Sequence, residues 1–453
     1  MAKDLWNTDI DVSAWDDVLT QWFERYWDAF VDPDSGIIYD NPVDLVTRSR
    51  ADCDIGTFQH TSPEDFQFPD DYARPDLGSW PTPEEVAASV PAINGWVTPI
   101  ENAASRCGML LAGLVRGAFA LTEERRQQAV QHLLRGMIAL WEVPGRTGFV
   151  CRGFLPQSGA FYRQTSHDQI PPYLYGLAAC HASSYVTDKD RNLIAQVVDS
   201  VLGWFEEGNW NMRLFGDSPE IAFRLLKDNN DPGTNTKLLA MLAMAHQVTG
   251  SDRWGRLYRK FRDEDNRKRF AHVARRDKSW LHFDPWQITM FLRFLSDYES
   301  DQECRDFYNE QRWLFMHTLA YFCEHPVPPP EDREMKTELR VLPDWRPALS
   351  ATVRADGFDP TNGRFWYQVG ANLKEMSPAS STEDMASPFD VSLFGLYSYI
   401  LAAYRNIMFD WPKERPTWGA EIISGRLKEV FDRARPGTIP ENVYIVAFAV
   451  SSI

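Results

Sequence analysis

The sequence predicts an all-α protein, an (α/α)6 toroid of six helical hairpins with long loops at the mouth of the barrel. The first observation behind this prediction is that helices apolar nearly all round alternate with amphipathic helices along the chain. The second is that the two kinds are equal in number, which suits a closed ring with one set enclosed and the other showing one face to water. The third is that no linker divides the 453 residues, so residues 1–453 are expected to form a single domain.

The helices expected inside the ring carry almost no charge, and such helices must be buried on all sides. They span residues 102–121, 170–186, 235–248, 286–298, 390–405 and 441–453. The helices expected outside have apolar residues on one face only. They span residues 13–31, 123–141, 191–207, 253–273, 303–324 and 419–433. Thr122 is the expected N-cap of the second of these. The ring closes if the helix of residues 13–31 pairs with the last inner helix, residues 441–453.

Two long, proline-containing segments separate these helices, residues 32–94 and 324–387. Segments of this length in a compact domain usually carry function or small sheets. Residues 363–369 have the pattern of a β-strand.

The composition excludes several classes of partner. The formal net charge of −17 argues against nucleic acid and anionic membranes, since both require a basic surface. No apolar run approaches the length of a membrane span. The six cysteines form no C-x-x-C pair and no zinc-ligand spacing, so we expect no metal and no cofactor. The N-terminus has no apolar signal region, which predicts a cytoplasmic protein, although a leader already removed would leave no trace in this sequence.

The N-terminal ends of the inner helices should gather at one end of the ring, because all inner helices of a ring of hairpins run in the same direction. Each of these helices begins with polar residues. Helix capping explains any one of them. Several carboxylates at one mouth, however, would form a site, and glycoside cleavage uses two carboxylates, one as general acid and one as base or nucleophile.

The clearest single motif is Thr165-Ser166-His167-Asp168-Gln169, directly before an apolar helix. Ser166 can cap the helix, which leaves His167 and Asp168 without an obvious structural task. Glu101 opens the preceding inner helix and is the second candidate carboxylate. We expect Asp168 to be the general acid, Glu101 to be the base or to support the acid, and His167 to orient the substrate. A capping acid and a packed imidazole are the alternative explanations.

Substrate contacts are expected from the loops and helix starts around this motif. Arg152 and Arg163 flank the loop before it, and they can bind a uronic-acid carboxylate or pair with the surplus acids of the chain. Aromatic side chains at the mouth can stack on sugar rings, and the chain has 17 tryptophans. The remaining candidates for substrate binding are Tyr173, His60, Trp96, Asp284, Trp286 and Trp366.

The chain resembles the six-hairpin glycosidase superfamily. The resemblance rests on the alternating helices, on Pro99-Ile100-Glu101-Asn102-Ala103-Ala104 at one inner helix, and on His167-Asp168-Gln169 at the next. The unsaturated glucuronyl and rhamnogalacturonyl hydrolases look nearest, and the resemblance to them implies that Asp168 is a general acid/base. Their paired-aspartate motif is not present, since Gln169 follows Asp168, which favours a sister family over membership.

We therefore expect a glycoside hydrolase that acts on oligosaccharides, those with uronic acid included, in carbohydrate metabolism or polysaccharide degradation. Three alternatives share the fold. A polysaccharide lyase would cleave next to a uronate by β-elimination, with base and acid among His60, His167, Tyr162 and Tyr173. A sugar epimerase would use histidines such as His60, His167 and His282. A carbohydrate binder would have no chemistry.

Overall fold

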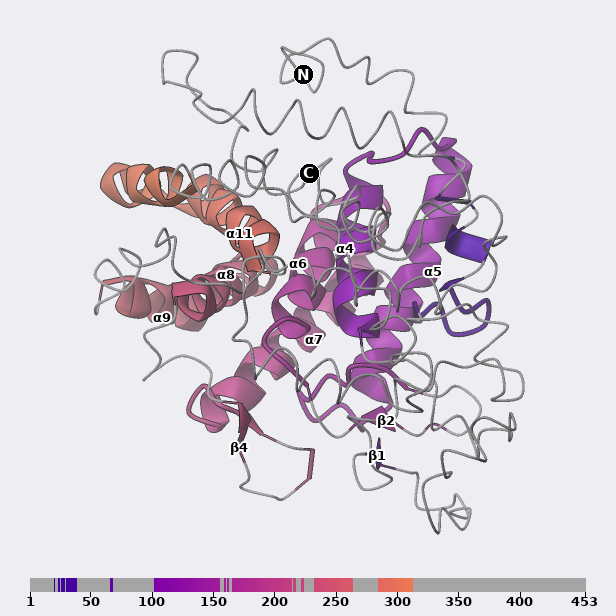
Figure 1. The fold of residues 1–453 in the computed structure, drawn as a ribbon, viewed down its shortest axis with the longest axis horizontal. Helices are drawn as coiled ribbons and strands as arrows, with labels where there is room; N and C mark the ends of the chain where they lie inside the picture. The colour runs from indigo at the N-terminus through magenta and orange to yellow at the C-terminus, as the bar shows by residue number, and fades with distance from the viewer. Residues whose placement is uncertain are drawn as a thin grey trace, which may run out of the picture.

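The computed structural model describes residues 102–154, 165–213, 232–263 and 284–312, together with parts of 20–38 and short pieces at 66–67, 159, 161–162, 215–216 and 221–223. Within these residues the chain is mostly helical, and its strands are two or three residues long. This confirms the all-α class for the described part of the chain (Figure 1).

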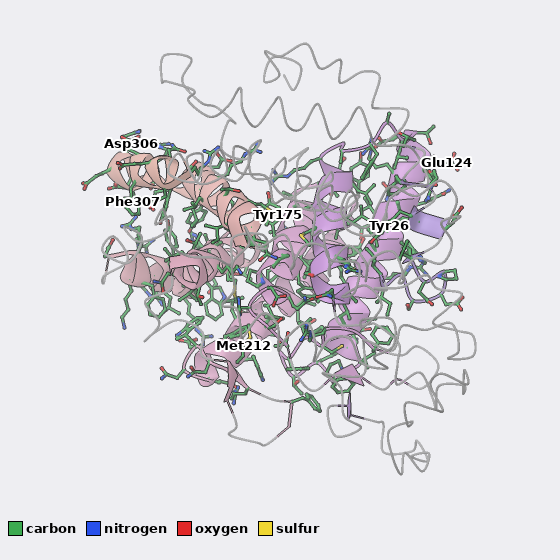
Figure 2. The ribbon with its side chains drawn as sticks, in the orientation of Figure 1. Tyr26, Glu124, Tyr175, Met212, Asp306 and Phe307 are labelled. Carbon is green, nitrogen blue, oxygen red and sulfur yellow. The ribbon has the colours of Figure 1, made fainter. Side chains whose placement is uncertain are left out.

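The helices predicted to be apolar form a connected series. They are α4 (Ala103–Val115), α6 (Ile170–His181), α8 (Pro232–Thr249) and α11 (Asp284–Tyr298). Consecutive members pack against each other: α4 on α6, α6 on α8 and α8 on α11. The rings of Tyr175 in α6 and Phe291 in α11 also meet, with centroids 6.1 Å apart, and Figure 2 shows Tyr175 beside α11. The buried apolar side chains of these helices belong to one cluster.

The amphipathic helices pair with the apolar ones. They are α5 (Glu123–Glu142), α7 (Asp188–Glu207) and α9 (Asp252–Asp263), followed by a helical segment at residues 302–312. α5 packs on α4, α7 on α6 and α8, and α9 on α8. Thr122 is the N-cap of α5 as predicted, because its side-chain oxygen accepts a hydrogen bond from the backbone N–H of Arg125 at 3.2 Å.

Helix ends are where the sequence prediction differs most from the structure. α4 ends at Val115 rather than at residue 121, because Gly117 has a φ of +85° and leaves the helical region. Arg126 of α5 donates to the carbonyl oxygen of Leu114 at 2.8 Å, and the backbone N–H of Gly117 donates to the same oxygen at 3.2 Å. α8 begins at Pro232, three residues earlier than expected, with proline in the first turn where its missing N–H costs nothing.

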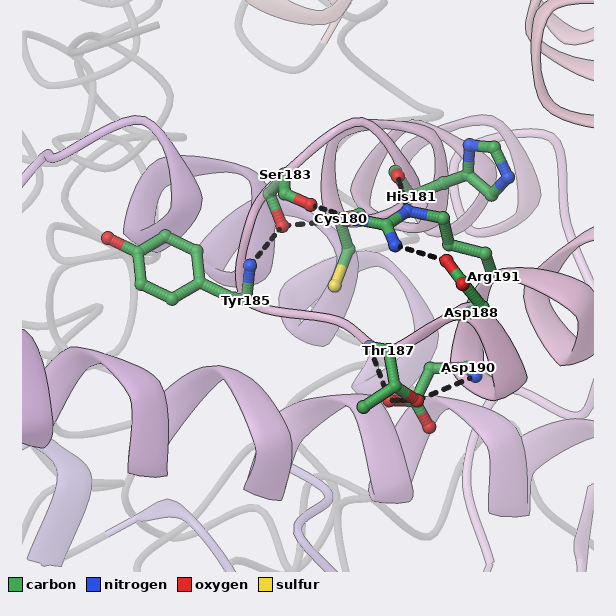
Figure 3. A network of polar contacts seen from close by, with 8 residues as sticks. All are labelled: Cys180, His181, Ser183, Tyr185, Thr187, Asp188, Asp190 and Arg191. Carbon is green, nitrogen blue, oxygen red and sulfur yellow. Dashed lines mark hydrogen bonds and ion pairs between the residues drawn. The ribbon is translucent and has the colours of Figure 1, made fainter.

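The turn between α6 and α7 is fixed by side-chain caps (Figure 3). Thr187 and Asp190 form a capping box, in which the Asp190 N–H donates to Thr187 Oγ1 at 3.2 Å and the Thr187 N–H donates to Asp190 Oδ2 at 2.9 Å. Arg191 donates to the carbonyl oxygens of His181 at 3.2 Å and Ser183 at 2.8 Å. These bonds end α6 at residue 181 and start α7 at residue 188, so both predicted ends, 186 and 191, were wrong.

α4 and α6 approach until their backbones touch. A Cβ atom added at Gly176 would lie 2.3 Å from the carbonyl oxygen of Gly108, and one added at Gly108 would lie 2.2 Å from the carbonyl oxygen of Pro172. Only glycine fits at both positions, because real Cβ atoms do not come so close to backbone oxygens. The two glycines therefore set the distance between the helices that begin at the predicted catalytic motifs.

Two short antiparallel ladders lie outside the helices. β1 (Phe66–Gln67) pairs with β2 (Phe161–Tyr162), with Phe66 opposite Tyr162. β3 (Met212–Arg213) pairs with β4 (Ile221–Phe223). The first ladder brings a piece of the long segment 32–94 next to the loop that precedes Asp168, which agrees with a sheet carried by that segment.

An N-terminal helical segment packs on α5. The positions described between residues 20 and 30 are helical, and Phe23, Tyr26 and Phe30 are buried. The Phe23 ring lies 4.8 Å from that of Phe119, and Glu24 forms an ion pair with Arg125 of α5 at 2.7 Å. Figure 2 shows Tyr26 close to α5.

The predicted helices at residues 390–405, 419–433 and 441–453 and the predicted strand at 363–369 lie outside the described residues. The closed ring therefore stays a prediction. None of the described helices is long and apolar enough to cross a membrane.

Candidate functional site

The starts of α4 and α6 are joined by the side chain of Gln169. This side chain is 1% exposed. Its Oε1 accepts from the backbone N–H of Ser105 at 3.1 Å, and its Nε2 donates to Asn102 Oδ1 at 2.8 Å. Gln169 therefore satisfies a free N–H in the first turn of α4, where the helix has no side-chain cap of its own.

The first turns of α8 and α11 also lie next to Asp168 at the start of α6. Gln287, in the first turn of α11, donates through Nε2 to the carbonyl oxygen of Asp168 at 3.4 Å. Lys237, in the first turns of α8, is 1% exposed, and its charge acts on the carboxylate of Asp168. The apolar helices that the structure describes thus begin around one residue, Asp168.

Asp168 is half-buried and surrounded by donors and positive charges. The hydroxyl of Ser166 donates to its Oδ1, and Gln169 Nε2 donates to its Oδ2 at 3.3 Å. Burial by itself would raise the pKa of this carboxyl, but Arg152, His167, the Ser166 hydroxyl and Lys237 together lower the pKa below its ordinary value. Asp168 is therefore ionised at neutral pH.

An ionised carboxylate cannot give a proton to a leaving group. A general acid in this role needs a raised pKa, as burial without a positive neighbour produces. The lowered pKa of Asp168 argues against the general-acid role expected from the sequence and favours the role of base or nucleophile.

Arg152 is held near the site by its own backbone. Its carbonyl oxygen accepts from the N–H of Ala104 in α4 at 3.1 Å. Its positive charge is the largest of the effects that lower the pKa of Asp168. The sequence predicted that Arg152 binds either an acid of the chain or a uronate of the substrate. The structure shows an acid of the chain near it, because its charge acts on Asp168.

Tyr173 does not face the cluster at Asp168. It is fully buried, and its hydroxyl donates to the carbonyl oxygen of Met137 in α5 at 2.8 Å. Burial raises the pKa of the phenol well above its ordinary value, so it stays protonated. The side chain is placed to hold α6 against α5, and this hydroxyl is not available as a catalytic base.

The structure describes no side chain for the remaining predicted site residues. The backbone of Asp284 and Trp286 belongs to the first turn of α11, which also carries Gln287. Those outside the described residues are Glu101, Arg163, His60, Trp96 and Trp366. The second carboxylate of the expected pair therefore remains a prediction.

Sequence reasoning missed Lys237 and Gln287. Lys237 is the one Asp, Glu, Lys or Arg in the stretch 235–248, which is otherwise apolar or neutral. A single charged residue in a helix that must be buried requires a partner, and this signal could have identified it. Gln287 lies in the first turn of α11, where a polar residue does not stand out because capping residues are common there.

No group of three or more His, Cys, Asp or Glu side chains that could hold a metal ion occurs in the described ranges. Cys107 and Cys180 are buried thiols, and burial raises the pKa of each to about 12, so both are inert core residues.

Comparison with protein-family models, curated proteins and solved structures found no match to this chain.

Proposed function

We propose that the protein is a glycoside hydrolase that acts on oligosaccharides, including those that contain uronic acid. The observation that carries this proposal is the half-buried, ionised carboxylate of Asp168 at the point where the apolar helices begin. Glycoside cleavage needs a positioned carboxylate of this kind as base or nucleophile. The resemblance of the motif His167-Asp168-Gln169 to six-hairpin glycosidases supports the same assignment.

The proposed toroid is the fold in which this arrangement is expected. Two contacts support it. The apolar helices follow one another side by side, with an amphipathic helix packed on each of α4, α6 and α8. The N-terminal segment lies against α5, because Glu24 forms an ion pair with Arg125 of that helix and Phe23 packs on Phe119 just before it. In a closed ring the segment that pairs with the last inner helix must be a neighbour of α5, which pairs with the first inner helix.

Asp168 serves in this proposal as the base or nucleophile. As base, it takes a proton from a water whose oxygen attacks the anomeric carbon while the glycosidic C–O bond breaks. As nucleophile, its own oxygen attacks that carbon, and water later releases the sugar. Arg152 and Lys237 keep the carboxylate ionised until a proton or a bond to carbon arrives.

The leaving oxygen must receive a proton from a second group. Glu101 is our candidate for this acid, because it is the sequence neighbour of Asn102, whose side chain is bonded to Gln169 beside Asp168. His167 lies on the other side of Asp168 in sequence and lowers the pKa of that carboxyl, so it is a second source of a proton or an orienting contact.

The placement of Tyr173 removes one of the four candidate residues of the lyase alternative. β-Elimination needs a base that removes the proton next to the uronate carboxyl, and the Tyr173 hydroxyl is already bonded inside the core. Asp168, in contrast, is ionised and partly accessible.

The test is a screen of the purified chain against plant and bacterial oligosaccharides. Reducing ends and ultraviolet absorbance are measured together for wild type and Asp168→Asn. The matched control is Asp188→Asn, since the Asp188 side chain is 97% exposed in the first turn of α7. Reducing ends lost only in Asp168→Asn support the proposal. New absorbance on a uronate polymer indicates a lyase, isomerised sugar without cleavage indicates an epimerase, and binding without product indicates a carbohydrate binder.

A further inference from the structure

We infer that a second ligand site lies between α5 and the N-terminal segment, and that it binds a uronate residue of an oligosaccharide. The inference rests on the proposed function in one respect, that the ligand is a carbohydrate. It goes beyond the proposed function because it assigns a site that takes no part in cleavage and names the acidic sugar as the group that this site recognises.

A pocket with a volume of about 460 Å³ opens between these two elements. This volume lies within the range of about 300–1,000 Å³ that is usual for small-molecule sites. The residues that line it are Trp27, Pro33, Arg125, Gln128, Gln131, His132 and Arg135. None of them belongs to the cluster at Asp168, so the pocket is separate from the candidate catalytic site.

A turn that carries Pro33 forms one wall of the pocket and is fixed before any ligand binds. Asp32 Oδ1 accepts from the backbone N–H of Ser35 at 2.6 Å, and the Asp32 carbonyl oxygen accepts from the N–H of Gly36 at 2.9 Å. A Cβ atom added at Gly36 would lie 2.1 Å from the carbonyl oxygen of His132, so the turn lies directly on α5. A preformed wall lowers the cost of ordering the site when a ligand binds.

Arg135 is the exposed positive charge of this pocket. Its guanidinium donates to His132 Nδ1 at 2.7 Å, and His132 Nε2 donates to the carbonyl oxygen of Asp32 at 2.8 Å. A guanidinium has no acceptor, so the imidazole must accept at Nδ1 and serve as an uncharged partner. No carboxylate forms an ion pair with Arg135 in the part of the chain that the structure describes. His132 therefore orients the charge of Arg135 without neutralising it.

The pocket offers a place for one negative charge. None of the described residues that line it is acidic, although the chain has a net charge of −17. The other arginine, Arg125, is already neutralised by Glu24, with hydrogen bonds of 3.1 Å from Nε and 2.7 Å from Nη2. Its guanidinium lies over the ring of Trp27, with Cζ 4.7 Å from the ring centroid. Arg135 thus remains as the one lining arginine whose charge a ligand can balance.

A uronate residue matches these groups. Its single carboxylate suits the planar fork of Arg135, which presents parallel N–H donors to such a group. Its hydroxyl groups can bond to the amides of Gln128 and Gln131, which contain both donors and acceptors. Trp27 and Pro33 supply apolar surface for the ring. A neutral sugar would leave Arg135 without a partner, and a phosphate would bring more negative charge than one arginine balances.

The experiment measures binding of sodium D-glucuronate to the full chain by calorimetric titration, with Asp168→Asn as the parent. Arg135→Met removes the charge and keeps an unbranched side chain. The matched control is Arg305→Met, because Arg305 also donates to a neutral acceptor three residues earlier on a helical segment, Gln302 Oε1 at 2.8 Å. The other probes are methyl β-D-glucopyranoside as a neutral sugar, sodium phosphate as an inorganic anion and a polyglutamate peptide as an acidic protein segment.

Glucuronate should bind the parent more tightly than any other probe. Arg135→Met should raise its Kd at least about tenfold, and Arg305→Met should leave its Kd unchanged. No binding of glucuronate to the parent, an equal Kd in Arg135→Met, or tighter binding of the neutral sugar, the phosphate or the peptide overturns the inference.

Thermal melts check that the variants are folded. If Arg135→Met has a lower Tm than the parent, Gln128→Ala decides, because Gln128 is exposed and bonds only weakly within α5, to Glu124 at 3.4 Å. Loss of its hydrogen bond to a sugar hydroxyl should raise the Kd of glucuronate about threefold or more. An unchanged Kd in Gln128→Ala then overturns the inference.

The outcome also separates this inference from the proposed function. Glucuronate binding that depends on Arg135, in a wild-type chain that releases no reducing ends, keeps the second site and rejects the hydrolase. Turnover by wild type, without glucuronate binding that depends on Arg135, keeps the hydrolase and rejects the second site.

Discussion

The contact between α4 and α6 predicts a marked effect of a single methyl group. In Gly176→Ala the new Cβ would lie 2.3 Å from the carbonyl oxygen and 2.5 Å from the Cα of Gly108. Both atoms are backbone, so no rotamer change relieves the clash, and the helices must move apart by roughly 0.7 Å or more. Because these helices carry Asn102 and Gln169, the separation also strains the bonds beside Asp168.

The size of the effect follows from two opposing contributions. Overpacking costs about 1–3 kcal/mol, with this contact at the upper end, and alanine gains about 0.5–1 kcal/mol over glycine inside a helix. The expected net loss is about 2 kcal/mol. At ~2.1 cal/mol/K of unfolding entropy per residue, a chain of 453 residues loses ~1 °C of Tm per kcal/mol. Scanning calorimetry should therefore find Tm about 2 °C lower in Gly176→Ala.

Gly203→Ala is the matched control. Gly203 lies inside α7, and a Cβ added there meets nothing within 4 Å. The same substitution should raise Tm by about 0.5–1 °C, since only the helix propensity changes. If Gly176→Ala is as stable as Gly203→Ala, or more stable than wild type, the backbone contact between α4 and α6 does not exist in solution.

Three further predictions concern ionisable side chains. The pKa of Asp168 is lowered in the folded chain, so the charge of this carboxylate stabilises the fold at pH values above its ordinary pKa of ~3.9. This contribution is lost as the pH falls. The Tm difference between wild type and Asp168→Asn should therefore shrink below about pH 4. Glu299 is 4% exposed and accepts a hydrogen bond from Arg262 at 2.8 Å. Glu299→Gln should therefore lower the free energy of unfolding by about 2–4 kcal/mol at pH 7. A Tm equal to that of wild type would contradict the contact. The pKa of His181 is lowered by burial and by Arg191, so Arg191→Met should raise it in an NMR titration, whereas an unchanged value would rule out the influence of Arg191.

The sequence was sufficient to find the described helices because their hydrophobic patterns are unambiguous. The stretch 102–121 has almost no charge and must be buried, while 123–141 has one apolar face. Both are helical, and the helix predicted at 123–141 matches α5 within one residue, while α4 is shorter than predicted. Helix ends were less predictable, since they depend on contacts from elsewhere. Arg126 and Arg191 bind the terminal carbonyls of α4 and α6, and no local pattern indicates this.

The candidate site was predicted only in part for a related reason. The motif at Asp168 could be found because two polar residues there lacked a local task. Its partners Lys237 and Gln287 come from helices that are 69 and 119 residues away in the chain, and which side chains meet depends on how the helices are packed. These partners also change the role proposed for Asp168 from general acid to base or nucleophile, because the pKa of a carboxyl depends on the charges around it.

The most direct test of the central claim is the rate of Asp168→Ala on the best oligosaccharide of the screen, measured with and without sodium azide. If Asp168 is the base or nucleophile, the variant should lose at least about 10²–10⁴ in kcat. Azide, which needs no proton removal, should then enter the space left by the carboxylate, restore part of the rate and give a glycosyl azide of inverted configuration. The product of the wild-type enzyme then distinguishes the two roles, because it is inverted if Asp168 is the base and retained if Asp168 is the nucleophile. A variant that cleaves the oligosaccharide as fast as wild type would contradict the assignment of Asp168 and the account of the site built on it.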